Sequence, residues 1–244
     1  MNPATEAEAI KLAHTSDKKG VVICPPFVYV TSVKRQVSRA KLGVQDVFYE
    51  EKGAYTGEVS ALMLKKLGVQ YVLVGHSERR RWLNETDEMI NKKVRAALKA
   101  GLRVILCVGE PLAVRRKGLA AAKNFVKSQL RADLKSLNPK SLPRRQAGYI
   151  LNSRLIVAYE PIWTIGTGKA DNPKETAEMI RFIKSYLQPT TYNLQPKVLY
   201  GGSVTSKNVE RIISYKEIDG ALVGGASIKA KEFAKIIKIT SRWN

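Results

Sequence analysis

The sequence is poor in cysteine and histidine, and it has no long apolar run. Its 244 residues include two cysteines and two histidines. Both cysteines, Cys24 and Cys107, lie inside apolar, strand-like runs, which favours buried reduced thiols over a disulfide framework or a metal site. No apolar run approaches the length of a membrane span, and no secretion-type hydrophobic region opens the chain. These absences predict a cytoplasmic protein without a membrane segment or a metal centre.

Acidic residues are half as numerous as basic ones. Asp and Glu number 21 against 42 Lys and Arg, which gives a net charge of +21 and a pI near 10.0. Such a pI is common among nucleic-acid binders. The basic residues are scattered, however, with short clusters only at 79–81, 115–117 and 144–145, and no stacking-aromatic motif accompanies them. We therefore interpret the charge as a solvated surface that attracts anionic metabolites, and a nucleic-acid partner is the less favoured alternative.

Short apolar segments alternate with helical patterns along the whole chain. This alternation with short connections predicts parallel strands joined by right-handed crossovers, in one α/β barrel domain over residues 1–244. The seven expected strands are 21–24, 43–47, 71–74, 104–108, 155–158, 198–200 and 220–223. The main expected helices are 3–16, 59–67, 84–100 with Asn84 as a possible cap, 112–136, 174–187, 206–214 and 229–238.

The stretch 155–169 carries the strongest functional signal. A buried strand ends in Glu160 and Pro161, and the loop from Ile165 to Lys169 with two glycines follows. A carboxylate at the mouth of a buried strand, followed by a glycine-bearing loop, is typical of a catalytic base under a movable lid. The alternative is that Glu160 serves only as an ion-pair partner.

Other strand ends carry a histidine or glycines. His76 follows the strand at 71–74, where it is either structural or a neutral hydrogen-bond donor near helix amides. Glycines occur in the loop at Gly166 and at the strand ends 201–203 and 224–225. Backbone amides at such junctions can approach an anion closely. Together these groups predict acid–base chemistry on a small phosphorylated substrate.

Six motifs resemble the triosephosphate isomerase family. They occur in the order GAYTGE, VGHSERR, ILCVGE, AYEPIWTIGTGK, YGGSV and LVGGAS. The resemblance as a whole covers essentially the whole chain from residue 2. The resemblance implies a TIM (β/α)8-type barrel and a cofactor-free enzyme of glycolysis and gluconeogenesis in the cytoplasm. It also implies the interconversion of D-glyceraldehyde 3-phosphate and dihydroxyacetone phosphate.

The resemblance also assigns roles to residues. Glu160 is expected to be the base, and neutral His76 to polarise the carbonyl group and move protons on the enediolate oxygens. Ser77 and Glu78 support them, although an ion-pair role for Glu78 is an equal alternative. The expected lid residues are Ile165, Gly166, Thr167, Gly168 and Lys169, and the expected phosphate-binding residues are Gly166, Ser203, Gly224 and Gly225.

The loop around Tyr55 resembles the dimer loop of the family. Thr56 matches the residue that reaches into the neighbouring subunit, and Glu58 and Arg79 match a charged pair near that interface. The resemblance therefore implies a homodimer. The alternative is that Tyr55 and Thr56 belong to a solvent-exposed loop with no partner.

The sequence departs from the family at its start. Family members begin with a short strand that ends in Asn-x-Lys, and Met1 matches a position after that lysine. We expect a barrel with seven recognisable strands, a weaker dimer and strongly reduced activity, because the lysine supplies charge to the phosphate and the oxyanion. Either Met1 is an internal methionine of a longer enzyme, which is favoured, or the chain begins here. The alternative function is a non-catalytic phosphate- or polyanion-binding barrel.

Overall fold

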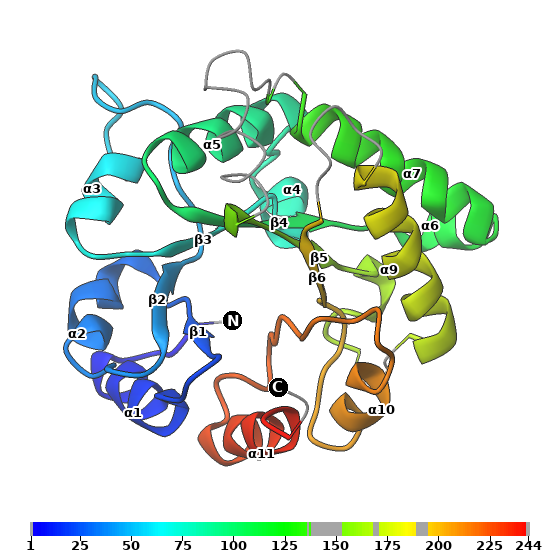
Figure 1. Cartoon of the computed structure of the whole chain (residues 1–244). Coiled ribbons are helices and arrows are strands. Elements are labelled where there is room, and N and C mark those ends of the chain that lie inside the picture. Colours follow the sequence, from blue (N-terminus) through cyan, green and yellow to red (C-terminus); the bar gives the residue numbers. More distant parts are fainter. Residues whose placement is uncertain (1, 136, 138–152, 168–170, 189–194, 243–244) are drawn as a thin grey trace.

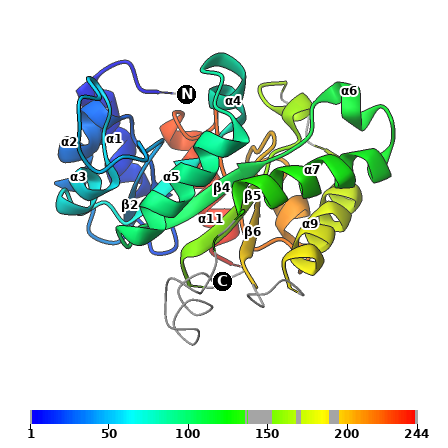
Figure 2. The same ribbon diagram turned by 90° about the horizontal axis from the view of Figure 1, so that it is seen from above.

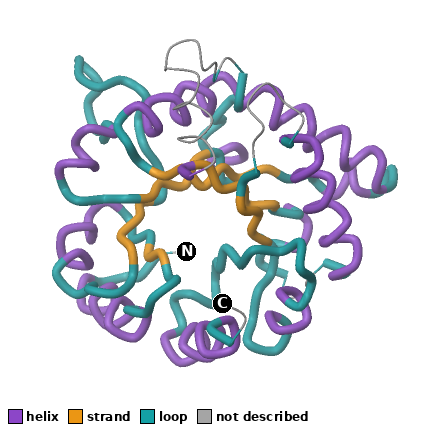
Figure 3. Tube along the Cα trace, in the orientation of Figure 1, coloured by secondary structure: helices purple, strands orange, loops and turns teal. Residues whose placement is uncertain are grey.

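The computed structural model describes residues 2–135, 137, 153–167, 171–188 and 195–242. Within them, six parallel strands form one sheet in the order of the sequence. The sheet curves into an arc with the helices outside it, so that strands line an inner ring (Figures 1 and 3). The strands are β1 Val22–Ile23, β2 Lys41–Val44, β3 Tyr71–Val74, β4 Arg103–Val108, β5 Leu155–Tyr159 and β6 Lys197–Tyr200.

The helices follow the strands in alternation, as the sequence predicts. Seen from above, α5 and α7 run along the outer side of β4 and β5 (Figure 2). The longer helices are α1 Glu6–Ser16, α5 Asp87–Lys99, α7 Leu119–Asp133, α9 Pro173–Leu187 and α11 Ala230–Thr240. The shorter ones are η1 Phe27–Tyr29, α2 Val30–Lys34, α3 Ala61–Lys66, α4 Ser77–Trp82, α6 Leu112–Arg115, η3 Ile162–Thr164 and α10 Val209–Ile213.

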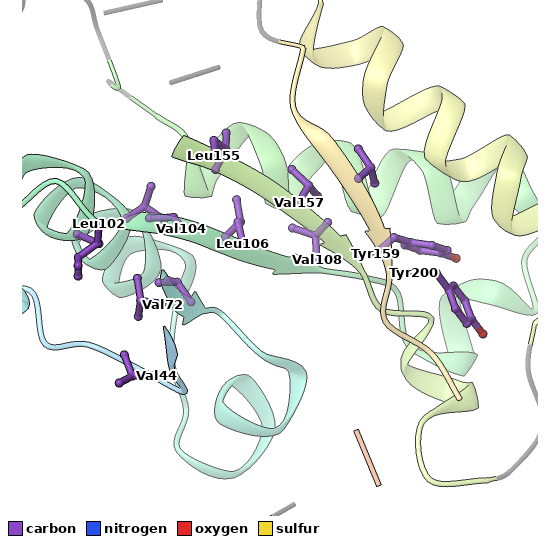
Figure 4. Close-up of a cluster of buried hydrophobic side chains, with 14 of the residues drawn as sticks. Val44, Val72, Leu102, Val104, Leu106, Val108, Leu155, Val157, Tyr159 and Tyr200 are labelled. Atoms are coloured by element: carbon purple, nitrogen blue, oxygen red, sulfur yellow. The ribbon is translucent and has the colours of Figure 1, made fainter. Parts of the chain in front are cut away.

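Two apolar layers result from the alternation of side chains along the strands. On β4, Val104, Leu106 and Val108 point outward and pack under the helices in the main core (Figure 4). The intervening Ile105 and Cys107 point inward, where they pack with Leu73 and Ala158. The register aligns β4 with β5 over five residue pairs, so both layers continue from strand to strand. Buried faces on both sides explain why these strands are continuously apolar in the sequence.

The last expected strand is wrong in extent. Instead of a strand at 220–223, the structure has one isolated parallel bridge between Tyr200 and Ala221, with hydrogen bonds from Tyr200 N to Gly220 O and from Leu222 N to Tyr200 O. Among the described residues, β1 pairs only with β2. The arc is therefore open between β1 and this segment, and six strands replace the seven that we expected.

Two helix boundaries also differ from the expectation. Asn84 does not cap the helix at 84–100, because it adopts a left-handed φ of 53° and Thr86 caps α5 by accepting from Met89 N. The helix expected at 112–136 divides into α6 and α7 at Gly118, whose φ is 96°.

Cys24 and Cys107 are free thiols, but only Cys107 is buried; Cys24 is half-buried.

Candidate active site

Glu160 lies at the carboxyl end of β5, where it is buried and held by two hydrogen bonds. Its amide donates to the Val108 carbonyl at 2.8 Å, which fixes the residue against the end of β4. The side chain is 2% exposed. Its Oε2 accepts from the Ser77 amide at 3.0 Å, and its Oε1 lies 3.1 Å from His76 Nε2. The structure therefore brings Glu160 next to His76 and Ser77, which lie more than eighty positions before it in the sequence.

The imidazole ring of His76 directs its Nε2 atom toward Glu160. It is the N-cap of α4, and its Nδ1 accepts a hydrogen bond from the Glu78 amide at 3.3 Å. A nitrogen that accepts has no proton, so in the neutral ring the proton is on Nε2, the atom that faces Glu160. Glu78 contributes mainly its amide here, since its carboxylate is 3.9 Å from His76 Nδ1 and largely exposed.

Two glycines make room for Glu160. A Cβ at Gly109 would lie 1.7 Å from the Glu160 carbonyl oxygen, and a Cβ at Gly201 would lie 2.8 Å from its Cγ. The amide of Gly109 donates to the buried Gln129 side chain at 2.9 Å, which holds this close approach in place. The strand ends after β4 and β6 must therefore be glycine for the carboxylate to sit where it does.

A second buried carboxylate, Glu110, lies behind the site. Its Oε1 accepts from Tyr159 Oη at 3.1 Å and from Trp163 Nε1 at 3.2 Å, and Arg115 Nη1 is 3.8 Å away. Burial raises the pKa of Glu110 above its usual value, and burial also raises the pKa of Tyr159. Sequence reasoning missed Glu110, Trp163 and Arg115. The signal for Glu110 was present, because GEP follows the strand at 104–108 just as glycines follow the others.

The root of the expected lid is anchored by its own backbone. Thr164 is 1% exposed and donates from its hydroxyl to the Pro161 carbonyl at 2.8 Å, and Thr167 does the same to Thr164 at 2.8 Å. A Cβ at Gly202 would lie 2.6 Å from Thr164 Oγ1, so the loop after β6 packs directly on this root. Gly166 has a φ of 75°, which glycine adopts without strain. The expected lid residues Gly168 and Lys169 lie outside the described residues.

Comparisons with known proteins agree with this arrangement. The family model for triosephosphate isomerase matches residues 2–240. The triosephosphate isomerase of Thermoanaerobacter sp. (strain X514) is 45% identical over 247 residues, covering 96% of this chain and 94% of the relative. That of Dictyoglomus thermophilum is 42% identical over 236 residues, covering 95% and 90%. The chain belongs to the triosephosphate isomerase family. Its barrel is accordingly of the TIM type.

The residues expected to bind phosphate follow successive strand ends. Gly166 comes after β5, Ser203 after β6, and the pair at 224–225 after the bridge at Ala221. Ser203 is half-buried, and its carbonyl accepts from Asn208 Nδ2 at 3.0 Å, which holds the loop. The Gly224 carbonyl accepts from both the amide and the hydroxyl of Ser227. Because all strands are parallel, these loops lie on the same rim as Glu160 and His76.

The loop around Tyr55, which the family resemblance assigns to a dimer interface, projects from the barrel (Figure 1). The bridge between Phe48 and Ser60 closes it at its base, and the Tyr55 ring packs on Phe48 with centroids 4.9 Å apart while remaining 45% exposed. Thr56 and Glu58 are exposed. The interface role of this loop stays a prediction.

Arg79 has partners inside its own chain that the sequence did not suggest. Its Nη2 lies 2.7 Å from Asp46 and its Nε 2.7 Å from Glu85, and buried Lys93 contacts the same two carboxylates. Within the described part of one chain, Glu58 forms no ion pair with Arg79; a pairing between subunits stays a prediction.

The described residues contain no group of three His, Cys, Asp or Glu side chains placed to hold a metal ion. None of the described helices is long and apolar enough to cross a membrane.

Proposed function

We propose that this protein interconverts D-glyceraldehyde 3-phosphate and dihydroxyacetone phosphate, a reaction of glycolysis and gluconeogenesis. The observation that carries the proposal is the pairing of Glu160 with the Nε2 edge of His76 at the rim of the barrel. The family match supports the substrate class. A cytoplasmic location follows from this function as a further prediction.

The geometry suits proton transfer through an enediolate. Glu160 takes a proton from the carbon beside the carbonyl group. The electron pair of that C–H bond forms the C=C bond of the enediolate, and the π pair of the carbonyl group moves to its oxygen. His76 Nε2–H donates to this oxygen and stabilises its developing charge. Glu160 then returns the proton to the neighbouring carbon after the proton on the other oxygen has moved, so the reaction is redox-neutral overall.

Substrate entry requires Glu160 to change partners. Its two oxygens now face the Ser77 amide and His76, so the carboxylate must leave at least one of them to reach a substrate carbon. The backbone amides of Gly166, Ser203, Gly224 and Gly225 bind the phosphate group, and the loop from Ile165 to Lys169 closes over it. Closure excludes water and protects the enediolate.

The 244-residue polypeptide is expected to be a slow catalyst. The family resemblance places a lysine cation at the phosphate and the oxyanion, and in the described ranges neither Glu160 nor His76 forms an ion pair with a lysine. Loss of one preorganised donor typically lowers kcat by about 10²–10³-fold. We also propose a homodimer in which Thr56 contacts the partner subunit.

The test is an isomerase assay on this 244-residue polypeptide beside a version extended upstream by a strand that ends in Asn-x-Lys. We expect activity in both, higher in the extended form by about 10²-fold or more. Equal rates would contradict the role of the lysine. If neither form were active but both still bound phosphate, the protein would be a non-catalytic phosphate-binding barrel instead of an enzyme.

A further inference from the structure

Basic side chains gather at the end of the barrel opposite the catalytic rim. β2 begins at Lys41, β4 at Arg103 and β6 at Lys197, and Arg154 directly precedes β5. Because all six strands are parallel, their starts lie at one end of the sheet. Helix α3, which leads to β3, ends there in two lysines. We call the six residues the basal cations: Lys41, Lys65, Lys66, Arg103, Arg154 and Lys197.

Two of the basal cations, Lys65 and Arg154, converge on one turn, and Arg103 begins the strand that follows this turn. A Cβ at Gly101 would lie 3.4 Å from Arg154 Nη1 and 3.8 Å from Lys65 Nζ, so two cationic groups face the same point. Lys65 Nζ also lies 3.4 Å from the Gly101 carbonyl oxygen. The register pairs Val104 with Leu155, which places Arg103 and Arg154 at adjacent positions before them.

The carboxylates of the described residues do not neutralise the basal cations. Among the described residues, none of the basal cations forms an ion pair. Two nearby acidic residues are already engaged: Asp17 accepts from the amides of residues 38–40, and Asp219 accepts from Val198 N and pairs with Lys184. Repulsion between unneutralised like charges is unfavourable, and an anion in solution relieves it.

Helix dipoles explain only part of this arrangement. A cation in the last turn of a helix is favourable, which accounts for Lys65 and Lys66 in α3. Lys41, Arg103 and Lys197 are the first residues of strands, where no such dipole acts. Their clustering therefore needs another reason.

We propose that the basal cations bind single-stranded nucleic acid. From β2 to β6 the strand starts span roughly 20 Å at the usual spacing of strands, enough for several successive phosphates. Arg103 also lies over the Tyr71 ring, 5.4 Å from its centroid, and donates to its hydroxyl at 3.1 Å. A guanidinium fixed by this contact and this hydrogen bond is a group on which an unpaired base can stack.

A membrane surface fits this end less well. Binding at a lipid interface needs large apolar side chains beside the cations. In the part of the chain that the structure describes, Leu67, 40% exposed, is the one strongly exposed large apolar residue that adjoins a basal cation in the sequence. Nucleic acid needs no apolar insertion, only phosphates and bases.

The test measures binding of a labelled oligouridylate of about 16 nucleotides by fluorescence anisotropy across a salt series. We expect a steep salt dependence in the wild type. Replacing Lys65, Arg103 and Arg154 together by Gln should weaken binding about tenfold or more and reduce the slope of log K against log salt by about 2. The matched control replaces the exposed residues Lys11, Arg116 and Lys117 by Gln, which removes the same charge elsewhere.

Each outcome decides the proposal. Equal weakening by the two triple variants would show that net charge alone binds the RNA, and the proposal would be wrong. Absence of binding at physiological salt would also overturn it, as would binding of vesicles of anionic lipid without binding of RNA. Unchanged isomerase rate and Tm in the basal triple variant would show that the loss is not caused by unfolding.

Discussion

The two ends of this barrel carry charge in opposite ways. At the rim, Glu160 and Glu110 are almost completely buried, and each has partners at stated distances. At the base, the cations are mostly exposed and none is ion-paired within the described residues. Burial and preorganised partners are what proton transfer requires, whereas exposed, unneutralised charge suits attraction of a large anion. The comparison predicts that changes at the rim are costly and that changes at the base are mild.

The largest effect is expected from Glu160→Gln at the rim. The amide keeps the shape and can still accept from Ser77, but it cannot take a proton, so kcat should fall by about 10²–10⁴-fold. Steady-state kinetics at high enzyme concentration measures this, with circular dichroism to show an intact fold. A decrease in kcat of less than threefold would show that Glu160 is not the base.

Breaking the buried charge network behind the rim should lower stability instead. Lys93→Met leaves Asp46 and Glu85 buried with Arg79 as their remaining partner, and we expect the free energy of unfolding to fall by about 3–5 kcal/mol. Lys92→Met is the matched control, because neighbouring Lys92 is exposed and its i,i+4 pair with Glu88 is screened by solvent, so a much smaller loss is expected. Urea unfolding of both variants decides, and equal losses would contradict the prediction.

A smaller loss is expected from Gly201→Ala. The new Cβ would lie 2.8 Å from Glu160 Cγ and displace the carboxylate, so kcat should fall about 10–100-fold. Gly43→Ala on β2 is the control, since a Cβ there would be equally crowded, 2.5 Å from Cys24 Sγ, and meets no residue of the site. If the two variants retained the same kcat, close packing of Gly201 on the base would not matter for catalysis.

The smallest effect is expected at the base, from Asp17→Asn. The amides of Ala40, Arg39 and Ser38 hold the pKa of Asp17 well below its usual value, so the charged form favours the folded state. This stabilisation is present above the unfolded pKa of about 3.9 and is lost as the pH falls toward the folded pKa. The Tm of the variant should therefore be slightly below wild type at neutral pH, and the gap should close in acid. A gap that widens in acid would contradict this sign.

The sequence predicted most of the fold because local patterns specify it. Six of the seven expected strands form where the apolar runs are, and the helices follow them. The seventh failed at 220–223, where pairing depends on neighbours on both sides, and only Tyr200 is paired there. The prediction that Asn84 caps the helix at 84–100 failed for a different reason, because asparagine tolerates the left-handed conformation as readily as it caps a helix.

The sequence indicated several of the residues that the structure brings together, but not the contacts between them. Glu160 and His76 stand out at strand ends, but the 3.1 Å approach of their side chains depends on two glycines, Gly109 and Gly201, from other loops. Likewise, Arg79 binds Asp46 and Glu85 through contacts that no local pattern encodes. The basal cations are scattered along the chain, and only parallel strands bring them to one end.

The most direct test of the central claim, that Glu160 moves a proton between two carbons, is isomerisation in D₂O followed by NMR of the product. Glu160 exchanges its proton with solvent while the enediolate persists, so we expect deuterium on the carbon that receives the proton. We also expect this signal to disappear with the rate in Glu160→Gln. Product formed without deuterium, or labelled product formed equally fast by the variant, would contradict the account.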